Sequence, residues 1–285
     1  MVAFQSGVFN IGAEGQFLAG ALAATAVGTR PAPAALHLLL VLTSGALAGA
    51  VVAAAAGALR ILRSVNEVIS TILLNFVLLY LVSYAVHGPL QEAAHRYPQS
   101  DPLLPSATLP AVFGSTRLHA GVPLAFMLAL AAGVLMRRTA LGLRLRAAGL
   151  NADAARLAGF PVRRDLAFAF ALSGALAGLA GAVEVAGVTG RLYERISPGY
   201  GYTAIAVALL GGLRAPGVVA AAVFFAALAA GASAMERSAG VSSVLVVAVQ
   251  GATLLAIATL NTRSVRKLLA PRPEPAAPEV GSGAA

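Results

Sequence analysis

The first residues that could do chemistry lie in a polar, glycine-interrupted segment near the start of the chain, Asn10-Ile-Gly-Ala-Glu-Gly-Gln16. Asn10, Glu14 and Gln16 belong to an otherwise apolar run, 8–28, and ionisable groups at membrane depth are costly and usually functional. Where glycines interrupt a helix, freed backbone groups and a carboxylate can line a water-filled path. The same carboxylate can instead join helices as a hydrogen-bonded hub. Both interpretations stay open.

A second set of polar residues recurs at every fourth position: Glu67, Thr71 and Asn75. At 100° per residue these positions fall within an arc of about 80° on one helix face. A polar stripe on an apolar helix should face the bundle or a solute pathway and not lipid. Because Ser64-x-x-Glu67 also matches a capping box, Glu67 either caps the helix start or lines the pathway. Asn75 is a candidate for the pathway or for the bundle interior.

Two tyrosines beside Pro198 and Gly199, Tyr200 and Tyr202, are candidates for an external gate or for an interfacial aromatic anchor. Catalytic patterns are absent from the sequence. It has no Gly-x-x-x-x-Gly-Lys-Ser/Thr loop for ATP phosphates and no arguable Ser/His/Asp arrangement. The histidines lack metal-ligand spacing: His37, His87, His95 and His119. We therefore predict no catalytic residue, no metal site and no cofactor bound by this chain.

Small residues dominate the apolar runs and predict how these pack. Ser44-Gly-Ala-Leu-Ala-Gly49 recurs as Ser173-Gly-Ala-Leu-Ala-Gly178, and each contains a Gly-x-x-x-Gly. In lipid such positions let helix backbones approach closely. Glu184 shares a helix face with small residues, which favours close packing around a buried hydrogen bond. The other members of that face are Ser173, Ala177 and Ala180.

Composition identifies the elements that must position these groups. The 285 residues are 59% hydrophobic and only 11% charged, with no Cys and no Trp, whereas soluble domains carry about 25% charged residues. Roughly 20 apolar residues cross a bilayer as a helix. The sequence therefore predicts an all-α, polytopic transmembrane helix bundle of about eight membrane segments. They are 8–28, 35–58, 66–86, 121–136, 166–186, 203–213, 216–234 and 241–260.

Two of these segments are expected to be broken or short, near 10–15 and 198–213. They open two triplets of crossings with opposite orientation, the first three spans and the last three. Inverted triplets with Gly/Pro-interrupted leading helices are what transport proteins use to build a pathway near the midplane. The topology thus indicates transport.

The net charge is +9, and the arginines lie in the gaps between the apolar runs. This distribution is typical of the cytoplasmic loops of a membrane protein and not of a nucleic-acid-binding groove. The loop 137–165 carries most of the net charge: Arg137, Arg138, Arg144, Arg146, Arg156, Arg163 and Arg164. This loop is predicted to be cytoplasmic and the Pro-rich loop 87–120 external. We expect a permease domain over 1–262, and a cytoplasmic basic end with a disordered tail over 263–285.

The cytoplasmic loop contains a predicted short helix, 152–158. Asn151 is a good N-cap, Asp153 lies in the first turn, and Gly159 stops the helix. Seven residues are too few for a helix stable in water alone, so this one must dock onto something. It can rest on its own membrane domain or enter a partner protein. Its apolar face is Ala154, Leu157, Ala158 and Phe160.

The loop resembles the coupling helix of ABC-importer permeases, which inserts into a groove of the cytoplasmic ATPase. Three further segments resemble the branched-chain amino acid/ribose-type permease family: Gly7-Val-Phe-Asn-Ile-Gly-Ala-Glu-Gly-Gln-Phe17, Asn66-Glu-Val-Ile-Ser-Thr-Ile-Leu-Leu-Asn75, and Ile196-Ser-Pro-Gly-Tyr-Gly-Tyr-Thr-Ala-Ile-Ala-Val-Ala-Leu-Leu-Gly211. The nearest fit is the nucleoside and simple-sugar uptake subgroup, and the second motif favours the larger of its two paired permeases. Family members usually carry one or two further crossings before the first motif, so either the start of this chain is misassigned or its bundle is shortened at the N-terminus.

The resemblance implies a non-enzymatic permease subunit that moves a nucleoside or simple sugar by alternating access. It implies as partners a cytoplasmic ABC ATPase that binds ATP, a second permease, an extracytoplasmic solute-binding protein and membrane lipid, but no nucleic acid. The expected location is the bacterial cytoplasmic (inner) membrane, with a cytoplasmic C-terminus. The candidate coupling residues are Arg146, Gly149, Asn151, Ala154, Ala155, Leu157 and Gly159. An ion-coupled secondary transporter and a branched-chain amino acid ABC permease are the alternatives.

Overall fold

The computed structural model describes residues 1–112, 118–239, 248 and 251–252. These residues form helices and no β-strand, and their only bridges are isolated ones, Gln99–Tyr193 and Ala111–His119. The predicted all-α class is therefore confirmed. The chain divides into two compact units, Met1–Phe224 and Phe225–Ala285. The packing described below is that of the first unit.

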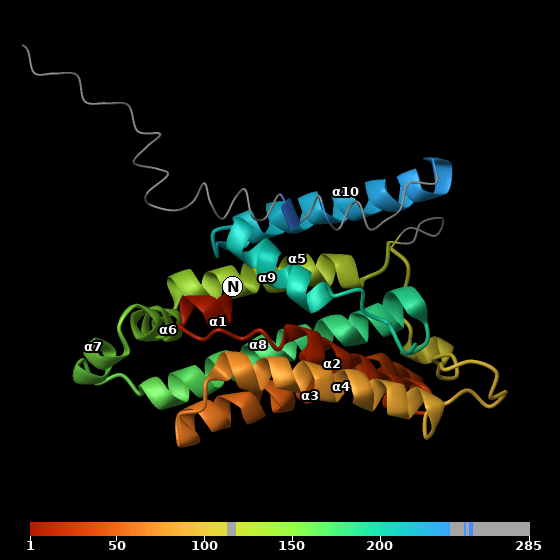
Figure 1. Ribbon diagram of the computed structural model, residues 1–285, viewed down its shortest axis with the longest axis horizontal. Coiled ribbons are helices and arrows are strands. Elements are labelled where there is room, and N and C mark those ends of the chain that lie inside the picture. The colour runs from red at the N-terminus through yellow and green to blue at the C-terminus, as the bar shows by residue number, and fades with distance from the viewer. Residues whose placement is uncertain (113–117, 240–247, 249–250, 253–285) are drawn as a thin grey trace, which may run out of the picture. The chain divides into compact units, whose positions relative to one another are not determined.

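The helices differ widely in length, and the short α9 lies beside longer ones (Figure 1). In chain order they are α1 (Val2–Gln5), α2 (Ala13–Gly28), α3 (Ala34–Arg63), α4 (Glu67–His87), the 3-10 turn η1 (Pro105–Ala107), α5 (Gly121–Arg138), α6 (Ala140–Leu150), α7 (Ala152–Leu157), α8 (Val162–Glu184), the π-helical turn η2 (Val185–Thr189), α9 (Tyr200–Leu210) and α10 (Ala215–Ala239).

Five of the described helices are long and apolar enough to cross a membrane: α3, α4, α5, α8 with its π-turn, and α10. The two interrupted segments are shorter, because α2 has 16 residues and α9 has 11. Each predicted span from the first to 216–234 thus corresponds to a helix. The predicted crossing 241–260 lies largely outside the described residues, and so does the whole of 263–285.

Helices α2, α3 and α8 pack with their backbones in contact, through glycines. A Cβ built on Gly178 would overlap the carbonyl oxygen of Gly45, and one built on Gly20 would overlap Gly178 itself. Gly49 and Gly174 exclude each other's Cβ in the same way. Both Gly-x-x-x-Gly motifs therefore act as predicted, since close approach supplies the dispersion contact that lipid cannot drive.

The outward faces of the long helices carry the large apolar side chains. Helix α4 shows the pattern most clearly, because Thr71 and Asn75 are buried on its inner face. Its outer face exposes Ile69, Leu73, Phe76, Val77, Tyr80 and Tyr84. Small or polar residues inside and large apolar residues outside are the distribution of a chain solvated by lipid. The stripe of residues at every fourth position faces the bundle, as predicted.

The two loops predicted to lie on opposite sides of the membrane emerge at opposite ends of the bundle (Figure 1). Helices α6 and α7 form one end. The chain after α4 forms the other end and is held to the segment after α8 by backbone hydrogen bonds. Ser100 N–H donates to Leu192 O at 2.9 Å, and Leu109 N–H donates to Ala186 O at 2.8 Å. The two loops are therefore separated as the predicted topology requires.

Candidate functional site

The polar segment before α2 is fixed by its own amide groups. The Asn10 amide nitrogen donates to Gln16 Oε1 at 2.9 Å, and the Gln16 amide nitrogen donates to Asn10 Oδ1 at 2.9 Å. Asn10 also donates to Ser173 Oγ on α8 at 3.0 Å and accepts from Gly12 N–H at 3.0 Å. Both amides are buried. The segment is thus a hydrogen-bonded loop that joins α2 to α8.

Asn75 caps the start of α2 from a different helix. The first N–H groups of a helix lack intrahelical partners, and the N-cap of α2 is Gly12, which has no side chain to offer. Asn75 Oδ1 instead accepts from Gly15 N–H at 2.8 Å, while its amide nitrogen donates to Ile11 O at 3.0 Å. One α4 side chain therefore satisfies the backbone of the interrupted segment on both sides of Gly12.

Glu14 makes the corresponding contact for α9. Its Oε2 accepts a hydrogen bond from Gly201 N–H at 2.7 Å, and the side chain is buried. A Cβ on Gly201 would overlap the Glu14 backbone. The start of α9 is also capped by Ser197 Oγ, which accepts from Tyr200 N–H at 3.0 Å. The two interrupted segments identified in the sequence therefore meet start to start, and a carboxylate lies where their dipoles favour one.

Glu67 departs from its predicted capping role. Helix α4 begins after Asn66, whose Oδ1 accepts from Val68 N–H, whereas Ser64 ends α3 in a left-handed conformation at φ 55°. The predicted capping box is therefore wrong, because the three residues 64–66 separate the helices and Asn66, next to the start of α4, is the cap. Glu67 forms an ion pair with Arg60 at 2.7 Å, and Arg60 also donates to Gly7 O at 3.1 Å. Through these contacts the loop before α2 is bonded to the end of α3 and lies beside the start of α4.

The two tyrosines have different surroundings: Tyr202 bonds to the bundle interior, whereas Tyr200 lines a cavity. Tyr202 Oη accepts from the Asn75 amide at 3.2 Å. The Tyr200 ring packs edge-on against Phe17, with centroids 5.8 Å apart. Of the predicted pathway residues, the structure therefore brings five together at one junction, which are Asn10, Gln16, Glu14, Asn75 and Tyr202. Thr71 packs beside Gly12 at the same junction, while Glu67 lies at the start of α4.

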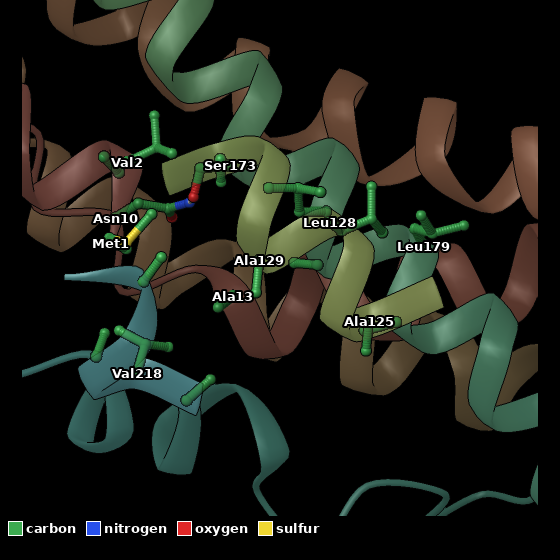
Figure 2. A pocket seen from close by; sticks show the side chains of 18 of the residues that line it. Met1, Val2, Asn10, Ala13, Ala125, Leu128, Ala129, Ser173, Leu179 and Val218 are labelled. Carbon is green, nitrogen blue, oxygen red and sulfur yellow. The ribbon is translucent and has the colours of Figure 1, made fainter. Parts of the chain in front are cut away.

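An apolar cavity of about 440 Å³ opens beside this junction, between α1, α5, α8, α9 and the start of α10. Alanine and leucine line most of it, and its polar lining is the Asn10–Ser173 pair (Figure 2). Ala177 and Ala180 also face this space. The close packing expected around the Glu184 face of α8 is therefore wrong: small residues there leave a cavity, because α5 does not close over them.

The α6–α7 segment carries the candidate coupling residues. Asn151 caps α7 as predicted, with Oδ1 accepting from Asp153 N–H and Ala154 N–H at 3.0 Å. Gly159 ends it at φ +82°. The preceding helix α6 was not predicted, although Thr139, whose Oγ1 accepts from Gly142 N–H at 3.0 Å, is a cap signal in the sequence. Arg146 lies half-buried on α6.

The coupling candidates point in two directions. Ala155 is 4% exposed and packs inward with Ala148 and Val162. Leu157 is 90% exposed, and so is Leu150 at the end of α6; Ala154 is exposed as well. Helix α7 therefore rests on its own bundle by one side and leaves an apolar side open.

Gly149 connects the α6–α7 segment to the polar junction. A Cβ on Gly149 would overlap Gln5 O, and one on Gly7 would press on the Gly149 backbone. Gly7 itself has φ +72°. From Gly7 the chain runs directly into the loop that Asn10 fixes. The backbone of α6 therefore contacts the turn that leads into the loop before α2.

Comparison with known proteins places this chain in a family. The model of the family described as branched-chain amino acid transport system / permease component matches residues 1–258. The glucose ABC transporter permease protein TsgB13 of Haloferax volcanii is 40% identical, over 90% of this chain and 70% of its own length. The guanosine ABC transporter permease protein NupP of Bacillus subtilis is 38% identical, over 90% and 75%.

A third relative, the nucleoside ABC transporter permease protein NupB of Lactococcus lactis, is 31% identical over 90% of this chain and 73% of its own length. No solved structure matches. The family match covers the polar junction, the cavity and the α6–α7 segment together. The chain is a multi-pass membrane protein that belongs to the family of ABC transporter permease components of the branched-chain amino acid type.

Proposed function

We propose that this chain is the membrane-spanning permease subunit of an ATP-driven importer for a neutral sugar or nucleoside. Relatives at 40% and 38% identity are named for glucose and guanosine, which supports the solute class. The main cavity supports it too, since its lining has no charged side chain to match an ionic solute. Its volume of about 440 Å³ is within the usual range for small-molecule sites.

One observation carries the proposal: α7 holds an apolar side away from its own bundle. Leu150 is the last residue of α6 and Leu157 the last residue of α7, and each side chain is 90% exposed. They lie at the end of the bundle where arginines collect, outside the predicted membrane spans. In the proposal these two leucines and the exposed Ala154 belong to an apolar surface that a partner covers. A secondary transporter, driven by ions, has no need of such a surface.

The contacts suggest how work would pass through the chain. Closure of the ATPase pair would displace α7 and, through the Ala155 packing, α6. Gly149 would then push on the Gln5–Gly7 turn, because no free space separates their backbones. That turn leads to the Glu14–Gly201 contact. Opening and closing around the cavity would follow from a shift of α9 against α2.

In this proposal the chain itself binds no ATP and is not an enzyme. Two ATPases dock at α7 from the cytoplasm, a second permease completes the pathway, and a solute-binding protein docks outside over the chain after α4. The protein lies in the bacterial cytoplasmic (inner) membrane with its C-terminus in the cytoplasm. The uneven distribution of arginines supports this orientation.

The test uses the chain produced with the products of its neighbouring genes. We expect an ATPase to co-purify, and proteoliposomes of the complex to take up guanosine or glucose only with ATP. Leu157→Asp should lose the ATPase and the uptake without unfolding the chain, because the side chain is exposed. Tyr97→Asp, also exposed but at the opposite end, is the matched control and should keep both. Uptake that continues without any ATPase would refute the proposal and favour the ion-coupled transporter.

A further inference from the structure

A second cavity adjoins the main one and contains a carboxylate. It measures about 330 Å³ and is lined in part by Phe17, Glu184 and Tyr200. The two cavities share four alanines, which are Ala13, Ala177, Ala180 and Ala204. Ser173 lines the main cavity and Glu184 the second, and the two positions are about 16 Å apart along one face of α8 at 1.5 Å per residue. The two cavities adjoin at the shared alanines, and α8 gives each of them a polar side chain.

Glu184 differs from the other described carboxylates because it has no partner among the described residues. Glu14 accepts from a backbone N–H, and Glu67, Asp165 and Glu92 form ion pairs. Glu194 accepts from Ser83 Oγ at 2.7 Å. The Glu184 side chain is half-buried, and no hydrogen bond or ion pair of its carboxylate occurs in the part of the chain described here.

An unpartnered carboxylate in an apolar cavity needs a ligand that donates hydrogen bonds. Neither cavity offers a charged side chain other than Glu184, so an anionic solute is disfavoured there. A carboxylate accepts through two oxygens and matches two adjacent donors. Phe17 and Tyr200, packed edge-on with centroids 5.8 Å apart, add an aromatic wall against which a ring can lie.

We infer that Glu184, with the Tyr200 hydroxyl, is the solute-recognition site of the pathway and binds a pair of adjacent hydroxyl groups on a neutral sugar ring. Free sugars and the ribose of nucleosides both present such a pair. The inference rests on the proposed function and assigns its solute contact. The amides of Asn10, Gln16 and Asn75 are already committed to the protein, whereas Glu184 is free to bind solute.

The absence of cysteine from the chain allows a direct test of access. In the complex with its ATPase, Glu184→Cys should react with a charged, water-soluble methanethiosulfonate reagent. Leu73→Cys, exposed on the lipid side of α4, is the matched control and should not react. We expect saturating guanosine or glucose, whichever the wild-type complex imports, to slow the reaction at least fivefold. An unreactive Glu184→Cys, or a rate that the imported solute leaves unchanged, would overturn the inference.

A second arm identifies the contact on the solute. Glu184→Gln keeps the shape of the side chain and should raise KM about tenfold for guanosine or glucose, the effect of one lost charge-assisted hydrogen bond. It should change KM less than twofold for 2′-deoxyguanosine or 2-deoxyglucose, which lack one hydroxyl of the pair. Glu194→Gln is the matched control and should leave both values unchanged. An equal rise for both solutes would overturn the assignment to the hydroxyl pair.

The two arms separate this inference from the proposed function. ATP-independent uptake would overturn the proposed function, and solute protection of Glu184→Cys would still support the site. ATP-dependent uptake would support the proposed function, and an unreactive Glu184→Cys in the same complex would overturn only the assignment of Glu184.

Discussion

Replacing Asn75 by alanine should strongly destabilise the bundle. The side chain is 3% exposed and joins α4 to both sides of Gly12. Asn75→Ala removes the acceptor of Gly15 N–H and the donor to Ile11 O, whose distances are 2.8 and 3.0 Å. Both backbone groups would remain buried without a partner, since Gly12 cannot cap α2.

The expected loss follows from these two groups. Each buried backbone group left without a hydrogen bond costs about 1–3 kcal/mol, so the two groups together cost about 2–6 kcal/mol of unfolding free energy. At about 2–4 °C per kcal/mol for a chain of this size, the midpoint should fall by roughly 4–24 °C. The matched control, Asn66→Ala, removes one exposed N-cap bond and should cost about 1 kcal/mol.

Thermal unfolding of the purified chain in detergent, followed by circular dichroism, measures both variants. A third variant, Tyr202→Phe, removes only the 3.2 Å bond to the Asn75 amide and should shift the midpoint by a few degrees at most. If Asn75→Ala unfolds within about 2 °C of Asn66→Ala, Asn75 does not cap α2, and the description of the junction is wrong.

Two further predictions concern the helix contacts and the external end. Gly178→Ala should cost about 1–3 kcal/mol in the same unfolding assay, because its Cβ overlaps the Gly45 carbonyl. Gly231→Ala, whose Cβ meets nothing, should be neutral or stabilising, and equal losses would refute the close packing. The Gln99 side-chain hydrogen bond, aided by backbone bonds from Tyr97 and Arg96 and by the charge of Arg191, holds the pKa of Glu92 below its ordinary 4.5 against the opposing effect of burial. That stabilisation is complete above pH 4.5 and is lost as pH falls through the lowered pKa, so pepsin should cut the chain after α4 faster as the pH drops below 4.5. Glu92→Gln should remove this pH dependence, and an unchanged pH profile in that variant would assign the effect to another group.

The sequence predicts the helical spans and the two interrupted segments because these depend on local composition. Apolar runs, glycines and caps such as Asn151 act within a few residues of themselves, and the structure places helices accordingly. The inward direction of Thr71 and Asn75 also follows from helix periodicity alone. Residue types and spacing suffice for these features.

The roles of the polar residues depend on partners far away in the chain, which spacing cannot identify. Glu67 fits a capping box locally, yet Arg60 of the preceding helix takes its carboxylate. Glu14 meets Gly201 across 187 residues. The sequence left each role open, and only the tertiary contacts distinguish a cap from a pathway group.

The packing around Glu184 could not be predicted from spacing either. A face of serine and alanines predicts close packing, but the outcome depends on whether another helix closes over it, and here two cavities remain. Gly149 and Ala155 were candidates for contact with a partner, and both touch their own bundle. Bulky residues at these two positions would therefore disturb α6 and α7 internally and cannot test docking.

The most direct test of the central claim is to cross-link α7 to the ATPase. Because the chain has no cysteine, Leu157→Cys provides a single reactive site on the exposed side of α7. A short thiol-to-amine cross-linker added to the purified complex should join this residue to the ATPase subunit, and mass spectrometry identifies the linked peptide. Tyr97→Cys, exposed at the opposite end, should give no such product. A Leu157→Cys variant that links only to its own chain, in a complex that still imports solute with ATP, would contradict the account.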